Sequence, residues 1–123
     1  MFEVEFYADR NGEESVKDFI RSEQASGRTN KYARIRAEKI LTYIRVLREY
    51  GTRAGMPYMK HIEDDIWELR PQSDRVFFFY FQKGCFVLLH HFEKKTMKTP
   101  RREIETARRN MRDYIERSKN HGK

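Results

Sequence analysis

Apolar and polar residues follow two different periods along this chain, and the periods separate predicted strands from predicted helices. In residues 2–6 apolar and polar positions alternate, which predicts a strand with one buried face. In residues 31–50 apolar positions recur at intervals of three and four, which predicts a long amphipathic helix that Gly51 ends. A shorter helix is predicted from its cap at Ser15 to the Ser26-Gly27 breaker.

Three strand-sized apolar runs follow residues 51–65, a segment whose glycines and proline predict irregular structure. The connections between the runs are short, and the second suits a hairpin, so we predict an antiparallel meander. The predicted strands are residues 66–70, 75–82 and 85–93. Thr99 and Pro100 suit the cap and the first position of a final helix. Its inner stripe is predicted to be Ile104, Ala107, Met111, Tyr114 and Ile115.

These elements predict a single α+β domain over residues 1–123, with the order β-α-α-β-β-β-α and a compact antiparallel sheet flanked by helices. A chain of 123 residues of which 38% are apolar can fill one core but not two. The last residues, 118–123, are expected to fray.

Cysteine usage and the N-terminal sequence bear on where the protein works. Cys85 is the only cysteine, so an intrachain disulfide is excluded. The first ten residues lack the basic region and the long apolar run of a signal peptide, and we therefore expect a cytoplasmic protein. No apolar run approaches the roughly 20 residues of a membrane span, so no membrane partner is expected.

Positive charge is concentrated at the C-terminal end. Residues 94–123 hold 11 Lys/Arg against 4 Asp/Glu, whereas residues 1–93 hold 15 of each sign. This imbalance predicts binding to a polyanion such as a phosphate backbone, although an acidic protein or a merely solvated helix face also fits. The candidate cations for such binding are Lys98, Arg101, Arg102, Arg108, Arg109 and Arg112.

Alternation along the predicted strands indicates which candidate functional side chains share a face of the sheet. In residues 66–70, Glu68 and Arg70 share one face with Ile66, while Trp67 and Leu69 are expected in the core. The aromatic run of residues 77–81 is predicted to be core packing, with Tyr80 as the candidate for stacking on a base because it has a polar group. Along the third strand, even-numbered residues from Phe86 to Lys94 are predicted to share a face.

The histidines could suggest a metal-binding site, but their positions in the sequence do not favour one. His90 and His91 are adjacent in a predicted strand, so they face opposite sides and cannot both bind one ion. No second cysteine or closely spaced acidic pair completes a site, so we predict no metal and no cofactor. His90 is expected in the core or an interface, whereas His61 follows Lys60 in a loop where acid–base chemistry is open to it.

Three segments of the chain resemble sequences of the RelE/ParE superfamily, the toxins of bacterial type II toxin–antitoxin modules, and most of all those of its HigB-type and phage-encoded members. The segments are FEVEFYADRNGEESVKDFI, GTRAGMPYMKHIEDDIWELRP and LLHHFEKKTMKTPRREIETAR, so the resemblance covers almost the whole chain. The resemblance implies a RelE-like fold and an mRNA interferase, an endoribonuclease that cuts mRNA in the ribosomal A site and inhibits translation. It also implies a cognate antitoxin, HigA-like with a helix-turn-helix, and a possible toxin–antitoxin heterotetramer.

The resemblance also carries over site residues. The positions that match the family's functional pattern are Lys60, Arg70, Arg75, Lys94 and Lys95. RNA cleavage by the substrate's own 2′-hydroxyl, without a metal, needs a base, an acid and cations that stabilise a dianionic phosphorane. Arg70 and Arg75 suit the stabilising role because they are permanently charged. The base is left open between Glu68 and a lysine, and the acid between a lysine, His61 and Tyr80.

Two other classes of function remain open from the sequence. The ParE branch shares the fold but inhibits DNA gyrase without cutting nucleic acid, and it lacks the catalytic cations that this chain has at Arg70, Arg75 and Lys94-Lys95. A non-toxic nucleic-acid-binding module is also consistent with the basic charge, since charge alone does not distinguish binding from cutting.

Overall fold

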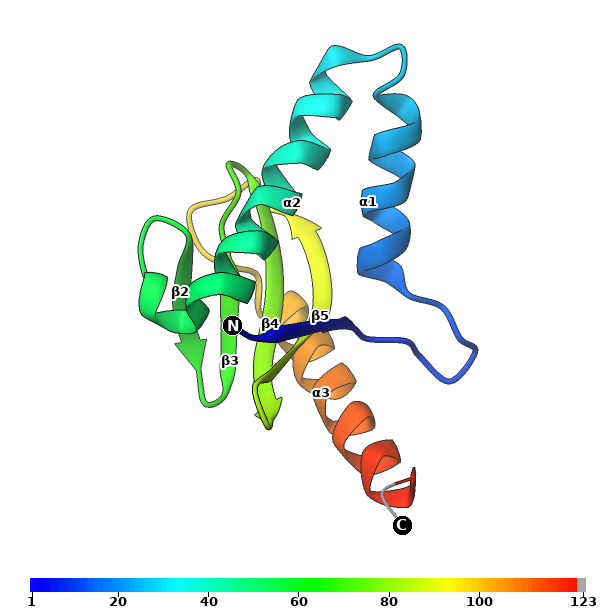
Figure 1. Cartoon of the computed structure of the whole chain (residues 1–123), viewed down its shortest axis with the longest axis vertical. Coiled ribbons are helices and arrows are strands. Elements are labelled where there is room, and N and C mark those ends of the chain that lie inside the picture. Colours follow the sequence, from blue (N-terminus) through cyan, green and yellow to red (C-terminus); the bar gives the residue numbers. More distant parts are fainter. Residues whose placement is uncertain (122–123) are drawn as a thin grey trace.

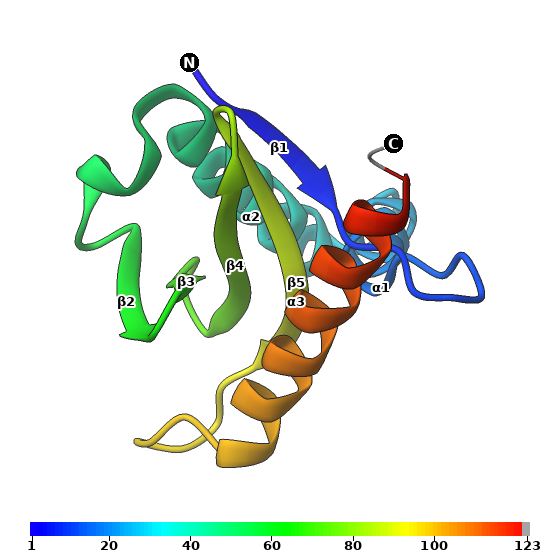
Figure 2. The same ribbon diagram turned by 90° about the horizontal axis from the view of Figure 1, so that it is seen from below.

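The computed structural model describes residues 1–121, without the side chains of the last two of these. The described residues form one five-stranded sheet with helices packed against both of its faces (Figure 1, Figure 2). The strands are β1 (Glu3–Phe6), β2 (Met59–Glu63), β3 (Ile66–Leu69), β4 (Asp74–Gln82) and β5 (Cys85–Glu93). The helices are α1 (Ser15–Ser26), α2 (Lys31–Tyr50), the short 3₁₀ helix η1 (Gly51–Ala54) and α3 (Arg101–His121).

The sheet confirms the α+β class and corrects two details of the prediction. Its strand order is β1-β5-β4-β3-β2, and the predicted meander of β3, β4 and β5 is antiparallel. β1, however, pairs with β5 in parallel, so the sheet is mixed. β2 lies within the segment predicted to be irregular, where it pairs antiparallel with β3. It is an edge strand with only Met59 fully buried and a bulge after His61, which explains why its sequence shows no alternation.

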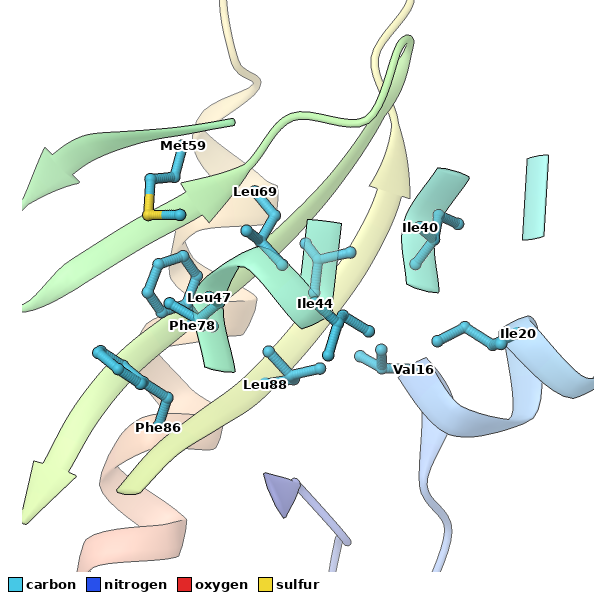
Figure 3. Packing of buried hydrophobic residues seen from close by; sticks show 11 residues of the cluster. Val16, Ile20, Ile40, Ile44, Leu47, Met59, Leu69, Phe78, Phe86 and Leu88 are labelled. Atoms are coloured by element: carbon cyan, nitrogen blue, oxygen red, sulfur yellow. The ribbon is translucent and has the colours of Figure 1, made fainter. Parts of the chain in front are cut away.

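Helices α1 and α2 form a helical hairpin that covers one face of the sheet. The core between this α1–α2 hairpin and the sheet is called the hairpin-side core (Figure 3). Leu47 of α2 and Leu69, Phe78 and Leu88 of the strands are among its most buried members. The buried residues of this core are Val16, Ile20, Ile40, Ile44, Leu47, Met59, Leu69, Val76, Phe78, Phe86 and Leu88. The helix boundaries follow the prediction, since α2 ends where the Gly51 N–H donates to the Leu47 carbonyl.

Helix α3 covers the opposite face and encloses the α3-side core. The buried residues of this core are Tyr7, Ile66, Phe77, Phe79, Val87, Leu89, Phe92, Ile104, Ala107 and Met111, with Tyr114 and Ile115 packed against them. The predicted inner stripe of the last helix is therefore confirmed. Because both faces of the sheet are covered, successive residues of β4 enter opposite cores, and this explains its unbroken apolar run. α3 is helical to His121, and residues 122–123 of the segment expected to fray lie outside the described part.

The side chain of Trp67 is less buried than the sequence predicts. It lies at the margin of the hairpin-side core, with its ring 5.4 Å from that of His61, centroid to centroid. Ile66, expected on the other face with Glu68, is fully buried in the α3-side core. Leu69 is fully buried as predicted, and Trp67 packs against the same core but is only partly buried, because β3 stands next to the edge strand, where the helices give less cover.

A bulge in β5 changes which of its side chains share a face. Phe78 pairs with Leu88 but Phe77 pairs with His90, which leaves Leu89 as an extra residue. Phe86 and Leu88 therefore enter the hairpin-side core and Phe92 the α3-side core, so the predicted shared face is wrong. Two neighbours still diverge as predicted: the ring of His91 stacks on Phe19 of α1, and Nε2 of His90 lies 2.6 Å from Glu103 of α3.

The α1–α2 hairpin is closed by backbone contacts at its turn. A Cβ atom on Gly27 would lie 2.8 Å from the Cα of Arg34, so only glycine permits this close crossing of the helices. The side chain of Asn30 caps α2 by accepting the N–H of Ala33. At α1, the predicted cap Ser15 is instead the first helical residue, and no side chain caps the helix at Glu14.

We predict that replacing Phe78 by alanine lowers the free energy of unfolding by about 3–5 kcal/mol, because the ring is completely buried. Tyr80→Ala on the same strand is the matched control, since its side chain is 48% exposed and its loss leaves a smaller cavity. Urea denaturation of both variants measures the difference. Equal losses would contradict the placement of Phe78 at the centre of the hairpin-side core.

Candidate functional site

Four cations gather around one carboxylate at the end of the sheet where β4 begins and β5 ends. The β2–β3 register sets Lys60 opposite Glu68, and the β3–β4 turn brings Arg75 back beside it. Lys94 follows β5, where its N–H donates to the carbonyl of Ser73 at 2.8 Å. Lys60, Arg70, Arg75 and Lys94 all act electrostatically on the Glu68 carboxylate. We call these four cations with Glu68 the basic cluster.

Glu68 is the buried centre of the basic cluster. Its side chain is 2% exposed, and its Oε2 atom lies 3.8 Å from Nη1 of Arg70 and from Nε of Arg75. Both distances allow ionic attraction but exceed hydrogen-bond length. Within the described residues, Oε1 of Glu68 and Nε of Arg75 have no hydrogen-bond partner. Buried polar atoms without partners are rare in folded proteins, which makes Glu68 and Arg75 candidates for a functional role.

Burial and charge act in opposite directions on the pKa of Glu68. Burial raises the pKa of this carboxyl above its usual value, and the attraction of Arg75, Arg70, Lys94 and Lys60 only partly offsets that rise. For Arg75, burial lowers the pKa, and the Glu68 carboxylate acts against this. Each buried charge therefore depends on the other for its ionised form.

The guanidinium of Arg75 is fixed by the turn that precedes β4. Its Nη1 donates to the carbonyls of Gln72, at 2.7 Å, and Asp74, at 2.8 Å. Gln72 has a positive φ of 57°, so the turn depends on a backbone conformation that residues other than glycine seldom adopt. The orientation of Arg75 is thus determined before any ligand binds.

Asp74 anchors the same turn from the opposite face of the sheet. Arg36 of α2 donates to both of its carboxylate oxygens, at 2.7 and 2.8 Å, and Nε2 of His91 donates at 2.8 Å. Burial alone would raise the pKa of Asp74, but the hydrogen bonds from Arg36 and His91 outweigh burial and lower it. Neither Asp74 nor Arg36 is among the residues predicted from the sequence. The available signal was an aspartate opening an otherwise apolar strand; its partner 38 positions away leaves no local trace.

Two candidate residues lie away from the basic cluster. His61 and Tyr80 line a hollow on the hairpin-facing side of the sheet, together with Tyr50, Arg53 and Trp67. Nε2 of His61 donates to the carbonyl of Asp64 at 2.6 Å, and the Tyr80 hydroxyl accepts the N–H of Gly84 at 2.8 Å. The structure therefore brings Lys60, Glu68, Arg70, Arg75 and Lys94 together, and it places His61 and Tyr80 elsewhere. Lys95 is exposed in the segment between β5 and α3.

Ion pairs involve three of the six candidate cations near the C-terminus, and in the weakest of them Nε of Arg102 lies 3.7 Å from Oε2 of Glu103. Arg101 donates to both carboxylate oxygens of Glu63 at 2.7 and 2.8 Å, and Arg108 binds the carboxylates of Glu63 and Asp64. These hydrogen bonds lower the pKa of Glu63. They join the start of α3 to the β2–β3 turn. Apart from Arg101 and Arg108, the candidates have exposed side chains: Lys98, Arg102, Arg109 and Arg112.

The described residues place no three His, Cys, Asp or Glu side chains where they could share a metal ion. None of the helices in the described part of the chain has the length and apolarity needed to cross a membrane. The Lys, Arg and Glu side chains of the basic cluster can supply charge stabilisation and proton transfer.

Fold and site together define a small α+β protein that concentrates cations at one end of a mixed sheet. Residues 31–112 match the sequence model of the family described as phage derived protein Gp49-like (DUF891). Because the match covers most of the chain, the protein belongs to the Gp49-like family, which is related to the RelE/HigB-like toxins of toxin–antitoxin modules. No curated protein matches the chain. The predicted superfamily is thus confirmed at this level, and the identity as a HigB-type toxin stays a prediction.

Glu68→Gln is predicted to stabilise the fold at neutral pH, because the neutral amide replaces a carboxylate whose ionised form burial disfavours. A raised folded-state pKa means that the stability contributed by protonated Glu68 is present below its unfolded pKa and is lost as pH rises through the folded pKa. The difference in free energy of unfolding between the variant and the parent should therefore shrink towards pH 4. Urea denaturation between pH 4 and 8 measures this difference, with Glu38→Gln, at an exposed position, as the control. A variant less stable than the parent at pH 7 would show that attraction to the arginines dominates.

Asp74→Asn is predicted to act in the opposite sense. The lowered pKa of Asp74 means that its contribution to stability is present above the unfolded pKa and is lost as pH falls through the folded pKa. Removing this buried charge from Arg36 and His91 should lower the free energy of unfolding by about 3–5 kcal/mol at pH 7, and by less in acid. The same pH series measures this loss. A loss that does not depend on pH would exclude the ionic component.

Proposed function

We propose that this protein is the toxin of a type II toxin–antitoxin module and that it cleaves mRNA at the ribosome. The observation that carries the proposal is the basic cluster, in which four cations surround a buried carboxylate at one end of the sheet. Membership of a toxin–antitoxin-related family supports the same class. A surface that only binds nucleic acid has no need for a buried carboxylate with an unpartnered oxygen beneath its cations.

Cleavage would proceed by attack of the substrate's own 2′-hydroxyl. A base takes the hydroxyl proton, the 2′-oxygen bonds to phosphorus, and the bond from phosphorus to the 5′-oxygen breaks. An acid protonates the departing 5′-oxygen, which leaves a 2′,3′-cyclic phosphate and a 5′-hydroxyl end. The phosphorane between these states carries two negative charges, and we assign its stabilisation to Arg70 and Arg75, which lie together beside Glu68.

Exposure divides the remaining roles within the basic cluster. Lys60 is exposed and Lys94 is partly exposed, so their amino groups can reach a bound RNA and carry out the proton transfers. Glu68 is 2% exposed and lies beneath the arginines, so we assign it the task of holding them in place. His61 and Tyr80 take no part in this assignment because they line the hollow on the other side of the sheet.

The partners follow from charge and exposure. Lys95 and the exposed cations Lys98, Arg102, Arg109 and Arg112 extend from the basic cluster along α3, and we assign them to contacts with ribosomal RNA. An antitoxin that neutralises the protein would place an acidic segment over the basic cluster, where it excludes the RNA.

Arg70→Ala and Arg75→Ala are each predicted to reduce cleavage by about 10²–10³-fold, the usual loss when one group that stabilises transition-state charge is removed. Arg70→Ala is the cleaner test, since its side chain is 21% exposed and that of Arg75 is 10% exposed. Arg45→Ala, an exposed arginine of α2, is the matched control. Circular dichroism and urea denaturation check the fold, and full cleavage by a folded Arg70→Ala, Arg75→Ala double variant would refute the assignment.

The decisive experiment maps the 5′ ends of a defined mRNA incubated with the protein, with and without translating ribosomes. Cuts that need ribosomes and disappear in Arg70→Ala are the expected result, and they would also give the codon preference. An absence of cuts from protein that still arrests bacterial growth would refute the proposal in favour of a gyrase inhibitor of the ParE kind. An absence of both cuts and growth arrest would leave a non-toxic binding module.

A further inference from the structure

The turn of the α1–α2 hairpin carries a second concentration of positive charge, separate from the C-terminal one. Residues 24–37 hold four Lys/Arg and no Asp/Glu. Three of these cations, Arg28, Lys31 and Arg34, are exposed at the turn. Two large side chains beside them are also exposed, Tyr32 at 69% and Ile35 at 42%. These five residues are called the hairpin tip.

The hairpin tip has a fixed shape. Arg34 donates through Nη1 to the carbonyl of Gly27 at 3.0 Å, and the backbone of Gly27 packs against Arg34 too closely to admit a Cβ atom. The Asn30 side chain caps α2 at the same turn. Since the backbone that presents the cations is already ordered, binding to the tip would require little loss of conformational entropy.

The hairpin tip and the basic cluster lie towards the same end of the sheet. Figure 1 shows the hairpin projecting past the end of β5, beyond the turn that leads into β4. Arg36 of α2 holds Asp74, and the next residue, Arg75, belongs to the basic cluster. Lys31 precedes Arg36 by five residues, which places its backbone about 8 Å further along the α2 axis. The basic cluster and the hairpin tip therefore lie towards one end of the sheet, and between them Arg36 is paired with Glu23, Asp74 and Glu93.

We propose that the hairpin tip binds the phosphate backbone of structured RNA, namely ribosomal RNA beside the mRNA that occupies the basic cluster. This inference rests on the proposed function, because it takes the ribosome as the site of action. Three exposed cations suit a line of phosphates even with Glu38 beside Arg28 and Arg34, and the exposed ring of Tyr32 offers a stacking surface to an unpaired base. The tip would thus fix the distance between the cleavage site and a second point of attachment.

The test compares two double variants that change the net charge equally. Arg28→Gln with Lys31→Gln removes two cations of the hairpin tip. Arg45→Gln with Arg48→Gln removes two exposed cations near the other end of α2. Binding to purified 70S ribosomes carrying a defined mRNA is measured by sedimentation at several KCl concentrations. The parent chain and both variants are compared, and circular dichroism checks that all three are folded.

Loss of the tip cations is expected to weaken ribosome binding at least tenfold. The slope of log affinity against log salt concentration should become shallower by about 1.5, because each phosphate contact contributes about 0.7–0.9 to it. The control variant should match the parent, and Tyr32→Ala should weaken binding without changing the slope.

Three other results would overturn the proposal. If the parent binds ribosomes and both double variants bind equally well, the hairpin tip has no role in RNA binding, and the proposed function stands. If the tip variant keeps ribosome affinity but loses the antitoxin, the tip is a protein interface. If the parent binds no ribosomes and produces no ribosome-dependent cuts, the proposed function fails, and the hairpin proposal fails with it.

Discussion

The carboxylate of Asp74 is the point at which the helical hairpin, the centre of the sheet and the basic cluster meet. It accepts hydrogen bonds from Arg36 of α2 and His91 of β5 on one face of the sheet. The next residue, Arg75, turns to the other face and lies beside Glu68. Because neighbouring strand residues alternate in direction, one ion pair that stabilises the fold also sets the backbone that presents a cation of the site.

The two buried carboxylates have opposite relations to their surroundings. Asp74 receives three hydrogen bonds, and its pKa is lowered. Glu68 has ionic neighbours at 3.8 Å, one oxygen without a partner, and a raised pKa. The first arrangement is that of a structural ion pair. The second leaves an acceptor of Glu68 and a donor of Arg75 without partners among the described residues, an arrangement more typical of functional groups than of structural ion pairs.

Local pattern was sufficient for most of the fold. The helix of residues 31–50, the meander and the inner stripe of α3 could be predicted because each depends on periodicity within a short stretch. β2 could not, because an edge strand with one buried residue shows no alternation. The bulge at Leu89 could not be predicted either, because the apolar and aromatic side chains around it can be buried on either face of the sheet. The parallel pairing of β1 depends on tertiary packing, which no local pattern records.

The cations at the strand ends could be predicted from the resemblance to toxins, and the position of Glu68 beside Arg70 could be predicted from strand alternation. The proximity of these residues to Lys60 and Lys94 could not, because it depends on the β2–β3 register and on where β5 ends. His61 was chosen for its expected position in a loop and Tyr80 for its polar group, but His61 belongs to strand β2 and both residues line the hollow on the other side of the sheet.

The joining of the chain's two ends has a consequence for how the protein folds. β1 pairs with β5, and the Tyr7 hydroxyl donates to Asp113 of α3, a residue 106 positions away. Contacts of such separation close large loops and form late, whereas the α1–α2 hairpin can form early from local contacts. Until α3 docks, Phe77 and Phe79 remain uncovered on one face of β4. A nascent or truncated chain that lacks α3 therefore exposes aromatic side chains of β4, and aggregation competes with folding at that stage.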